Sequence, residues 1–268
     1  MKHKINNQGA TVIGDELALH SKLGLLERTY IRVFGVPING LRIRLRRILP
    51  ILSGHPEKVL DAGCGRGVFS YQIAKMFPEA VVVGVDRDEA QLEINRTIAD
   101  RARLTNLHFI NMDVAKLAYD NEFDLVLSVD NLEHIENDLI AIQHLAKALK
   151  EGGSLIMHVP GRERRWFFLN FKDNFDVPGH YRPGYTLPDI RCKVESAGLK
   201  VSYAYYTYGL LETLTNNISY LITRAEAKNR LAYAMCFPFL NIISWFGRNS
   251  RPAKGAGVLL TARKNNTL

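Results

Sequence analysis

The stretch VLDAGCGRGVFS, residues 59–70, places a glycine-rich turn directly after a short apolar run. The apolar run predicts a buried strand, and the residues that follow the turn fit a helix. Gly63, Gly65 and Gly67 have no side chain that blocks a ligand, and they tolerate left-handed backbone. A strand, a tight glycine turn and a helix are the opening unit of an open α/β fold, which binds its ligand at the carboxyl ends of the strands.

The alternation of apolar runs and helical patterns continues along the chain to residue 160 and resumes after residue 187. We predict strands over 58–63, 80–86, 107–113, 123–130, 152–159, 200–208 and 255–264, with helices over about 67–77, 88–103, 136–149 and 187–199. Strands that alternate with helices build a parallel sheet covered on both faces. The fold class predicted is therefore a doubly wound α/β, Rossmann-like fold with a seven-stranded sheet.

Composition limits the class of protein and its compartment. With 47% hydrophobic and 23% charged residues in 268, the chain buries a full core and is neither disordered nor fibrous. The three cysteines are far apart, without metal-ligand spacing, and the N-terminal stretch has no signal-peptide pattern. We therefore expect a cytoplasmic protein. The formal net charge is +8, but the basic residues are grouped rather than spread, so the charge alone does not predict nucleic-acid binding.

The glycine spacing discriminates between two classes of ligand. A dinucleotide turn has the spacing G-x-G-x-x-G, whereas this turn has G-x-G-x-G. Asp61, expected at the lip of the turn, would repel a pyrophosphate but would attract a ligand with an ammonium and a sulfonium group. S-adenosylmethionine carries both groups. The pattern thus favours this cofactor over a nicotinamide dinucleotide.

Three further carboxylates follow successive predicted strands, where an open α/β sheet binds its ligand. Asp86 is placed to accept hydrogen bonds from ribose hydroxyls, and Asp113 from an adenine amino group, with Met112 or Val114 against the ring. Asp130 is expected near the transferred group. The alternative is that these aspartates only cap the helices that follow them. Four acids in register with a glycine turn form the more specific signal.

These residues resemble the motifs of the class I S-adenosylmethionine-dependent methyltransferases over about residues 55–160. The resembling segments are VLDAGCGRG, VVGVDRD, NMDV, FDLVLSVDNLEHI and LKEGGSLIMHVP. The resemblance implies the sheet order 3-2-1-4-5-7-6 with the last strand antiparallel. It also implies a set of cofactor-binding residues: Asp61, Gly63, Cys64, Gly65, Gly67, Asp86, Arg87, Met112, Asp113, Val114, Asp130 and Asn131.

The stretch DNLEHIEND, residues 130–138, resembles the quinone-biosynthesis methyltransferases and their relatives. In that resemblance Asp130, Glu133 and His134 repeat an acid-x-x-Glu-His spacing that could hold Mg²⁺ and lower the pKa of a substrate phenol. The favoured interpretation is that Glu133 and His134 only shape the pocket. No metal is predicted, and a divalent ion stays an alternative.

The segment 161–186 is rich in arginine and aromatic residues and follows the fifth predicted strand, where this fold inserts a substrate-covering segment. We interpret it as an aromatic lid over an apolar substrate; a nucleic-acid surface is the rival interpretation. His180 is the candidate general base, since imidazole titrates near neutral pH. The candidate catalytic residues are His180, His134 and Tyr185, and for His180 the alternative is a loop histidine bonded to backbone.

Two segments outside the predicted sheet complete the domain organisation: an N-terminal helical segment, 1–54, and an insertion over about 210–250 within the methyltransferase domain, 55–268. Residues 25–52 fit two short amphipathic helices with Arg28, Arg32, Arg42, Arg44, Arg46 and Arg47 among apolar positions. We expect such helices to pack on their own domain; contact with anionic lipid at the inner face of the membrane is the alternative. The apolar run 231–246 is too short and too interrupted to span a bilayer.

The function predicted from the sequence is methyl transfer from S-adenosylmethionine to oxygen, nitrogen or carbon of a small, lipophilic acceptor, without nucleic acid as a partner. The alternatives are a nucleic-acid or protein methyltransferase and a protein that binds the cofactor without turnover. The sequence does not name the acceptor.

Overall fold

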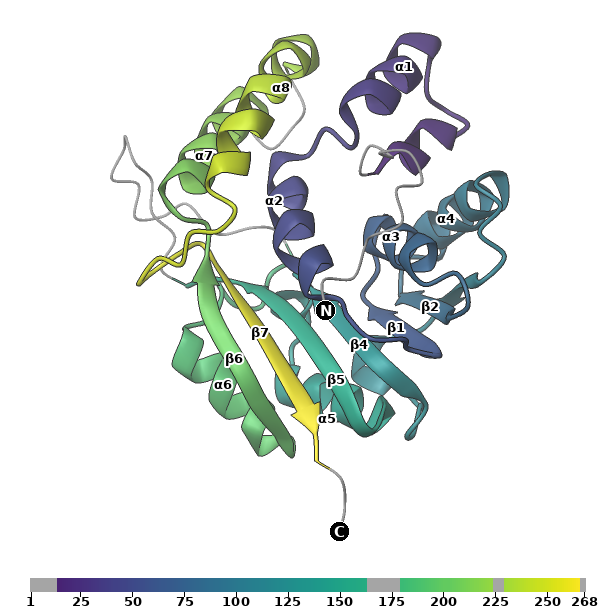
Figure 1. Cartoon of the computed structure of the whole chain (residues 1–268), viewed down its shortest axis with the longest axis vertical. Coiled ribbons are helices and arrows are strands. Elements are labelled where there is room, and N and C mark those ends of the chain that lie inside the picture. Colours follow the sequence, from purple (N-terminus) through teal and green to yellow (C-terminus); the bar gives the residue numbers. More distant parts are fainter. Residues whose placement is uncertain (1–13, 163–178, 224–228, 266–268) are drawn as a thin grey trace.

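The computed structural model describes residues 14–162, 179–223 and 229–265. These residues form one seven-stranded sheet with helices on both faces and more helices above its carboxyl edge (Figure 1). The strands are β1 (Lys58–Ala62), β2 (Val81–Asp86), β3 (Leu107–Asn111), β4 (Phe123–Val129), β5 (Leu149–Pro160), β6 (Leu199–Thr207) and β7 (Gly257–Lys264).

The sheet order is β3-β2-β1-β4-β5-β7-β6, as predicted. The first five strands of this order pair in parallel, and β7 runs antiparallel between β5 and β6. Parallel strands that are covered on both faces are nearly all apolar, and Val82 to Val85 on β2 are buried accordingly. The predicted fold class is thereby confirmed.

Three of the longer helices begin after a residue whose side chain satisfies a free N–H group of the first turn. Asp88, Asn137 and Thr186 each accept a hydrogen bond from a backbone N–H two or three positions inside the next helix. The helices are η1 (Asp15–Leu19), α1 (Leu25–Phe34), α2 (Asn39–Ile48), η2 (Leu49–Ile51), α3 (Val68–Met76), α4 (Glu89–Arg101), η3 (Val114–Lys116), η4 (Leu132–His134), α5 (Asp138–Ala148), α6 (Leu187–Ser196), α7 (Leu210–Thr223) and α8 (Arg230–Phe246).

Two hydrophobic cores lie on opposite faces of the sheet. One packs α5 and α6 against the strands, with Ile142 and Ile190 fully buried. The other packs α2, α3 and α4 against the opposite face, with Leu45 and Leu92 fully buried. Since Leu45 belongs to α2, this N-terminal helix contributes to the core on that face of the sheet.

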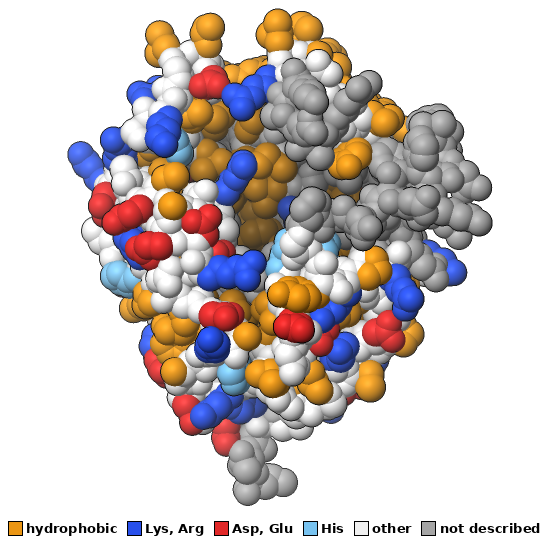
Figure 2. Space-filling model, turned by 180° about the vertical axis from the view of Figure 1, so that it is seen from behind, with side chains coloured by type: hydrophobic (Ala, Val, Ile, Leu, Met, Phe, Trp, Pro, Cys, Tyr) orange, Lys and Arg blue, Asp and Glu red, His pale blue; other side chains and the backbone are white. Residues whose placement is uncertain are grey.

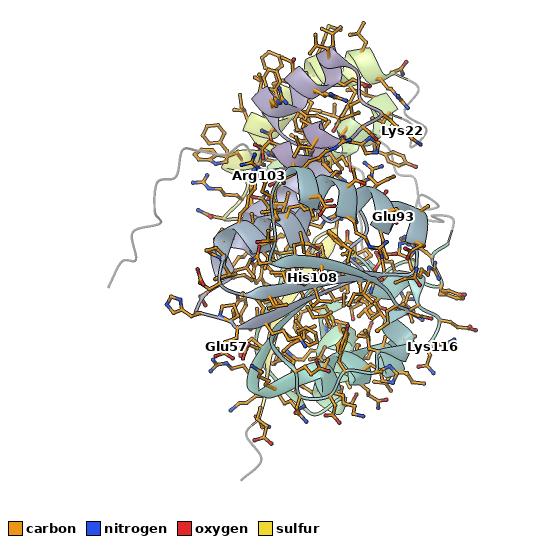
Figure 3. The ribbon with its side chains drawn as sticks, turned by 90° about the vertical axis from the view of Figure 1, so that its right-hand side faces the viewer. Lys22, Glu57, Glu93, Arg103, His108 and Lys116 are labelled. Atoms are coloured by element: carbon orange, nitrogen blue, oxygen red, sulfur yellow. The ribbon has the colours of Figure 1, made fainter. Side chains whose placement is uncertain are left out.

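Helices α1, α2, α7 and α8 form an upper layer above the carboxyl ends of the parallel strands (Figure 1). Figure 3 shows this layer from the side: the labelled Lys22 belongs to it, whereas Glu57 and His108 lie in the sheet half. A buried ion pair joins the layer internally, because Arg47 Nε on α2 donates to Glu212 Oε1 on α7 at 3.0 Å. This layer is positioned to cover whatever binds at the carboxyl edge.

The arginines of α2 are engaged inside the molecule. Arg42 and Arg47 are buried, and Arg42 donates to Asn241 Oδ1 at 3.3 Å. Arg44 pairs with Asp130, and Arg46 donates to Ser244 at 2.7 Å. The favoured expectation, that this segment packs on its own domain, agrees with these contacts, and these side chains do not form a lipid-facing basic surface. Among the described residues, none of the helices combines the length and the apolar character that crossing a bilayer requires.

Candidate active site

The glycine turn joins β1 to α3 at the carboxyl edge of the sheet. Its three glycines have positive φ values of 77° at Gly63, 49° at Gly65 and 70° at Gly67. A Cβ added to Gly63 would lie 2.3 Å from the side chain of Asn131, so only glycine fits there. A Cβ on Gly65 would meet no described atom within 4 Å. The turn therefore presents open backbone on the side of Gly65.

Asp86 fixes the turn from the end of β2. Its Oδ2 accepts from Gly65 N at 2.8 Å and its Oδ1 from Asp88 N at 3.1 Å. The carbonyl of the same residue is held as well, because Asn95 Nδ2 donates to Gly65 O at 2.7 Å. Each Asp86 oxygen accepts one hydrogen bond here, so each has a lone pair left for a ligand hydroxyl. The structure places Asp86 beside the turn, where the sequence predicts a ribose-binding acid.

Asp61 lies beneath the glycine turn rather than at its lip. Its side chain is 2% exposed, and Ser70 Oγ of α3 donates to Asp61 Oδ2 at 2.5 Å. Burial, and to a smaller extent the charge of Asp86, raise the pKa of Asp61 to about 6 although the bond from Ser70 opposes this. Asp61 is therefore buried below the turn and not exposed at its lip, which corrects the expected position.

The residues predicted to line an adenine ring separate into two groups. Met112 is half-buried, and its N–H donates to Asp86 O at 3.0 Å, which holds it beside the ribose-binding acid. Val114 instead packs in the hydrophobic core at 4% exposure, so it is removed from the candidate ligand contacts. Asp113 is exposed and caps η3 by accepting from Ala115 N at 2.9 Å, as the alternative interpretation stated. Arg87 is exposed as well.

Asp130 is held by a network at the end of β4. Its backbone has a φ of +46°, Oδ1 lies 2.6 Å from His158 Nδ1, and Oδ2 pairs with Arg44 of α2. The other ring nitrogen of His158 lies 3.0 Å from Thr207 Oγ1. This network ties the upper layer to strands β4, β5 and β6. Both Asp130 oxygens thus have protein partners, so Asp130 is a positioning residue of this edge.

Glu133, His134 and His180 form a cluster next to this network. One ligand atom of each lies within 4.8 Å of those of the other two, and the two imidazole rings are perpendicular with centroids 4.4 Å apart. His134 Nδ1 lies 3.0 Å from Gly179 O, so the carbonyl fixes the proton on Nδ1 and leaves Nε2 as the acceptor. Two predicted catalytic residues, far apart in sequence, are therefore brought together.

The composition of this cluster suits either proton transfer or a divalent cation. A buried carboxylate and two imidazoles form a recognised donor set for Zn²⁺ or Mn²⁺ and a less typical one for Mg²⁺. The acid-x-x-Glu-His spacing placed Asp130 in such a set. The structure places His180 there instead, because the Asp130 carboxylate is turned toward Arg44 and His158.

Tyr185 belongs to a different network from the two histidines. It is 3% exposed, its hydroxyl donates to Asp138 Oδ2 at 2.9 Å, and Arg182 donates to that hydroxyl at 3.0 Å. Burial raises the pKa of Tyr185 well above its ordinary range. Arg182 also donates to Leu132 O at 3.0 Å, which fastens this segment to η4. We assign Tyr185 to this structural network and not to the catalytic groups.

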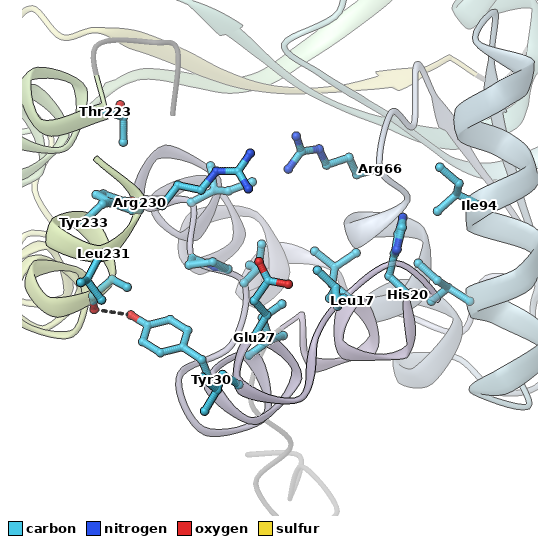
Figure 4. A pocket seen from close by; sticks show the side chains of 18 of the residues that line it. Leu17, His20, Glu27, Tyr30, Arg66, Ile94, Thr223, Arg230, Leu231 and Tyr233 are labelled. Carbon is cyan, nitrogen blue, oxygen red and sulfur yellow. Dashed lines mark hydrogen bonds between the residues drawn. The ribbon is translucent and has the colours of Figure 1, made fainter. Parts of the chain in front are cut away.

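A cavity of about 810 Å³ lies between η1, α1, α4 and the start of α8. Its walls are mostly apolar and include Leu17, Ile31, Ile94 and Leu231. Charged side chains also line it: Figure 4 shows Arg66 and Arg230 extending into the cavity from opposite walls, with Glu27 below them. Figure 2, seen from behind, shows a hollow with hydrophobic walls in the upper half of the molecule.

The cavity reaches the glycine turn, because Arg66 belongs to both. On the other side of the turn, Asn131 lies against Gly63 and leads directly into η4 with His134. The turn therefore lies between an apolar cavity and a pair of imidazoles. Among the described residues that line the cavity there is neither His134 nor His180. The aromatic residues of 163–178, predicted to form a lid, lie outside the described residues.

Sequence reasoning missed three features of this site. His158 lies inside an apolar strand, where a histidine carries no local signal, and Arg44 lies in a run of arginines whose members look alike. The walls of the cavity come from segments separated by up to two hundred positions, such as Leu26 and Leu231. Asp130 has a positive φ although it is not a glycine, and such strained backbone beside a sheet edge often marks a functional site. This indication is visible only in the structure and not in the sequence.

Comparisons with known proteins agree with this geometry. A family profile described as a methyltransferase domain matches residues 55–191, half of the chain. The ubiquinone biosynthesis O-methyltransferase of Coxiella burnetii (strain Dugway 5J108-111) is 31% identical over 121 residues, which are 45% of this chain and 50% of that protein. The chain thus spans about half the length of this curated relative.

Solved structures share the fold at low sequence identity. The phosphoethanolamine N-methyltransferase 2 of Haemonchus contortus, in complex with S-adenosyl-L-methionine, has a TM-score of 0.62 at 17% identity, over 95% of this chain and 61% of that one. The [4+2]-cyclase SpnF has a TM-score of 0.60 at 18% identity, over 88% and 84%. A cyclase among these neighbours means that the fold by itself does not establish the reaction.

Proposed function

Because this chain belongs to the methyltransferase domain family of the class I S-adenosylmethionine-dependent enzymes, we propose that it transfers the methyl group of S-adenosylmethionine to a small, largely apolar acceptor. The observation that carries the proposal is the apolar cavity of about 810 Å³ that ends at the glycine turn. A relative of similar sequence is named for an O-methyl transfer in ubiquinone biosynthesis. A nucleic acid or a protein surface would call for a broad polar surface rather than an apolar cavity.

The residues present fit the cofactor. The open backbone at Gly65 accommodates the methionyl part, and the Asp86 oxygens accept from the ribose hydroxyls. Asp61, ionised below the turn, offsets the positive charge of the sulfonium and ammonium groups. The cofactor supplies an activated methyl group; what remains for the protein is to align the acceptor, to exclude water and to handle a proton.

The acceptor lies with its apolar body in the cavity and its nucleophilic atom at the glycine turn. Transfer forms a bond between this atom and the methyl carbon, while the carbon–sulfur bond breaks and its electron pair stays on sulfur. Apolar walls from α1, α4 and α8 remove water from this path. For a hydroxyl acceptor, the proton passes to an imidazole of the His134–His180 pair, which lies on the other side of the glycine turn from the cavity. An amine or enolate acceptor needs no such base.

The same cluster is where a divalent cation would bind. Glu133, His134 and His180 are the residues that would hold it, and a cation there would lower the pKa of an acceptor hydroxyl. The proposed reaction does not depend on it. We place the protein in the cytoplasm, where its acceptor is a small lipophilic metabolite.

The test is release of S-adenosylhomocysteine by the purified protein, with a cell extract separated into a small-molecule and a macromolecular fraction. We expect turnover with the small-molecule fraction and none with Gly65→Val, whose side chain fills the open side of the turn. Turnover with the macromolecular fraction alone would show a nucleic-acid or protein methyltransferase. Binding of S-adenosylmethionine without turnover in either fraction would support the non-catalytic alternative.

A further inference from the structure

Helix α8 carries a continuous apolar stripe on its outer face. Leu231, Met235, Phe239, Ile242 and Phe246 follow one another at helical spacing and are 76%, 62%, 69%, 56% and 66% exposed. The opposite face of the same helix is buried, as Phe237 and Leu240 show. Large apolar side chains in such a row on a folded protein mark a surface that contacts another apolar phase.

Helix α1 adds a second apolar surface at the same end of the molecule. Leu25 and Leu26 are 79% and 87% exposed, and Val33 and Phe34 follow near the other end of the helix. Both helices belong to the upper layer and stand farthest from the sheet (Figure 1). Leu26 and Leu231 also line the cavity, so the cavity opens between the two apolar surfaces.

The charges on these helices are mainly cationic. Arg32 and Arg230 are exposed, and the guanidinium of Arg248, just after α8, stacks on Trp245 at 3.6 Å. Glu27 is the acidic residue of α1. Its exposed carboxylate accepts a hydrogen bond from Gly24 N at 3.0 Å. A Trp–Arg pair beside an apolar stripe is typical of a membrane–water interface, where the ring lies at headgroup level and the cation meets lipid phosphate.

We propose that α1 and α8 form a docking surface for an anionic lipid bilayer, with the apolar stripe in the acyl boundary and the arginines at the headgroups. A bilayer fits better than a protein partner because most of the stripe, Met235 to Phe246, is exposed outside the cavity and the charged side chains beside it are mainly cationic. The cavity then opens into the lipid, from which a lipophilic acceptor enters it. This last step rests on the proposed function, whereas the docking itself does not.

The proposed surface differs from the arginine run of α2. Arg42, Arg44, Arg46 and Arg47 are engaged by α7, α8 and Asp130 and are not available to lipid. A vesicle experiment can therefore separate the two ideas, since they depend on different residues.

The experiment is cosedimentation of the full chain with phosphatidylcholine vesicles that contain about one-third phosphatidylglycerol, where each basic residue near the surface adds to binding. We expect binding that weakens with salt and falls at least about tenfold in the double variant Phe239→Glu/Phe246→Glu, which removes two exposed apolar side chains that would enter the acyl boundary. The variant Arg32→Gln/Arg248→Gln is expected to lose the dependence on phosphatidylglycerol and on salt. A matched control is Met76→Glu/Ile140→Glu, which places the same charges at exposed apolar positions of the α/β core.

The inference is overturned if the native protein does not bind these vesicles, or if the double variant binds them as well as the control does. It is also overturned if sedimentation velocity shows that α8 pairs with a second copy, with dimers that the double variant dissolves and no lipid binding. Phe239 and Phe246 are not among the cavity-lining residues, so calorimetry with S-adenosylmethionine should give the native affinity in all variants. Vesicle binding without methyl transfer would refute the proposed function and leave this inference standing; methyl transfer without vesicle binding would do the reverse.

Discussion

At the scale of single residues, Asp61 is the group whose ionisation we expect to affect the binding of a cationic ligand most strongly. Burial first, and Asp86 second, raise its pKa to about 6, so the protonated form is favoured in the free protein at mildly acidic pH. The stability that this protonation adds is fully present below the ordinary pKa of an aspartate. It is lost as the pH rises through about 6.

Binding of S-adenosylmethionine has the opposite dependence, because a cation prefers the ionised carboxylate. We predict that affinity increases as the pH rises from about 5 to 7, by up to about tenfold for each pH unit below the pKa, and then levels off. Asp61→Asn should bind more weakly at pH 7 and show no such increase. Calorimetry over this range measures it, and equal pH profiles for the two proteins would contradict the role given to Asp61.

Asp86 joins the ligand site to the glycine turn. Asp86→Ala removes the acceptor for ribose hydroxyls and also the partner of Gly65 N, so we predict that S-adenosylmethionine binding weakens by about 1.5–3 kcal/mol. The control is Asp113→Ala, which removes an exposed cap and should weaken binding less. Calorimetry at pH 7.5 compares the two variants. An unchanged affinity in Asp86→Ala would show that the ribose lies elsewhere.

His180 is the residue that tests proton transfer. If the acceptor is a hydroxyl, His180→Ala should lower kcat by about 10²–10⁴-fold and leave cofactor affinity unchanged. Tyr185→Phe serves as the comparison: its hydroxyl bridges Arg182 and Asp138, so this change should lower stability and not kcat. Full turnover in both His180→Ala and His134→Ala would mean that the acceptor is already nucleophilic. A loss restored by added Zn²⁺, Mn²⁺ or Mg²⁺ after chelation would instead indicate a metal at Glu133.

At the scale of elements, local signals were sufficient for most boundaries. Asp88 and Thr186 cap α4 and α6 within a residue or two of the predicted starts, and Asn137 sets α5 at residue 138 where 136 was expected. β5 begins at Leu149, three residues early, because Leu149 pairs with Phe123 across an irregularity in the β4–β5 register. Such an irregularity depends on the neighbouring strand, so the LKEGG pattern alone predicts only the turn.

The contact between α2 and α7 is the element-scale interaction with the largest expected effect on stability. Arg47 is buried and donates to the Glu212 carboxylate, whose pKa is raised by burial and lowered by Arg47. Arg47→Ala leaves this carboxylate buried without its partner, so we predict a loss of about 3–5 kcal/mol in the free energy of unfolding. Urea denaturation is the measurement, with the exposed Arg263→Ala on β7 as control, expected within about 0.5 kcal/mol of the native protein. A comparable small loss in both variants would contradict the structural role of the pair.

At the scale of the whole molecule, the sequence predicts the strands of the sheet well and the packing of the upper layer poorly. The strands and the glycine turn are encoded by neighbouring residues, so the place of Asp86 at the end of β2 was predictable from local patterns. The order of the sheet was predictable only through the resemblance to the class I methyltransferases. The partners of Arg44, Arg46 and Arg47 are 86 to 203 positions away. Local periodicity indicates that α2 is amphipathic but not which neighbouring elements cover it. Contact of its arginines with lipid was therefore an alternative that the sequence alone did not exclude.

The same limit applies to the cavity. Its walls combine η1, α1, α4 and α8, and the turn residue Arg66 connects them to the cofactor edge. The sequence predicted a lipophilic acceptor but did not indicate this cavity, which we propose as its binding place. The layer that forms the cavity also carries the exposed stripe of α8, so the proposed acceptor site and the proposed lipid-docking surface lie at one end of the molecule.

The central claim is that a methyl group passes from S-adenosylmethionine to a small apolar molecule, and its most direct test is to follow the methyl group itself. The purified protein is incubated with cell extract and S-adenosylmethionine labelled with deuterium in the methyl group, and the label is traced by mass spectrometry in organic-solvent, aqueous and precipitated fractions. We predict that the label appears on a discrete metabolite in the organic-solvent fraction and that the Gly65→Val variant transfers no label. Label found only in precipitated protein or nucleic acid, or label that stays on S-adenosylmethionine in every fraction, would contradict the proposed methyl transfer to a small apolar molecule.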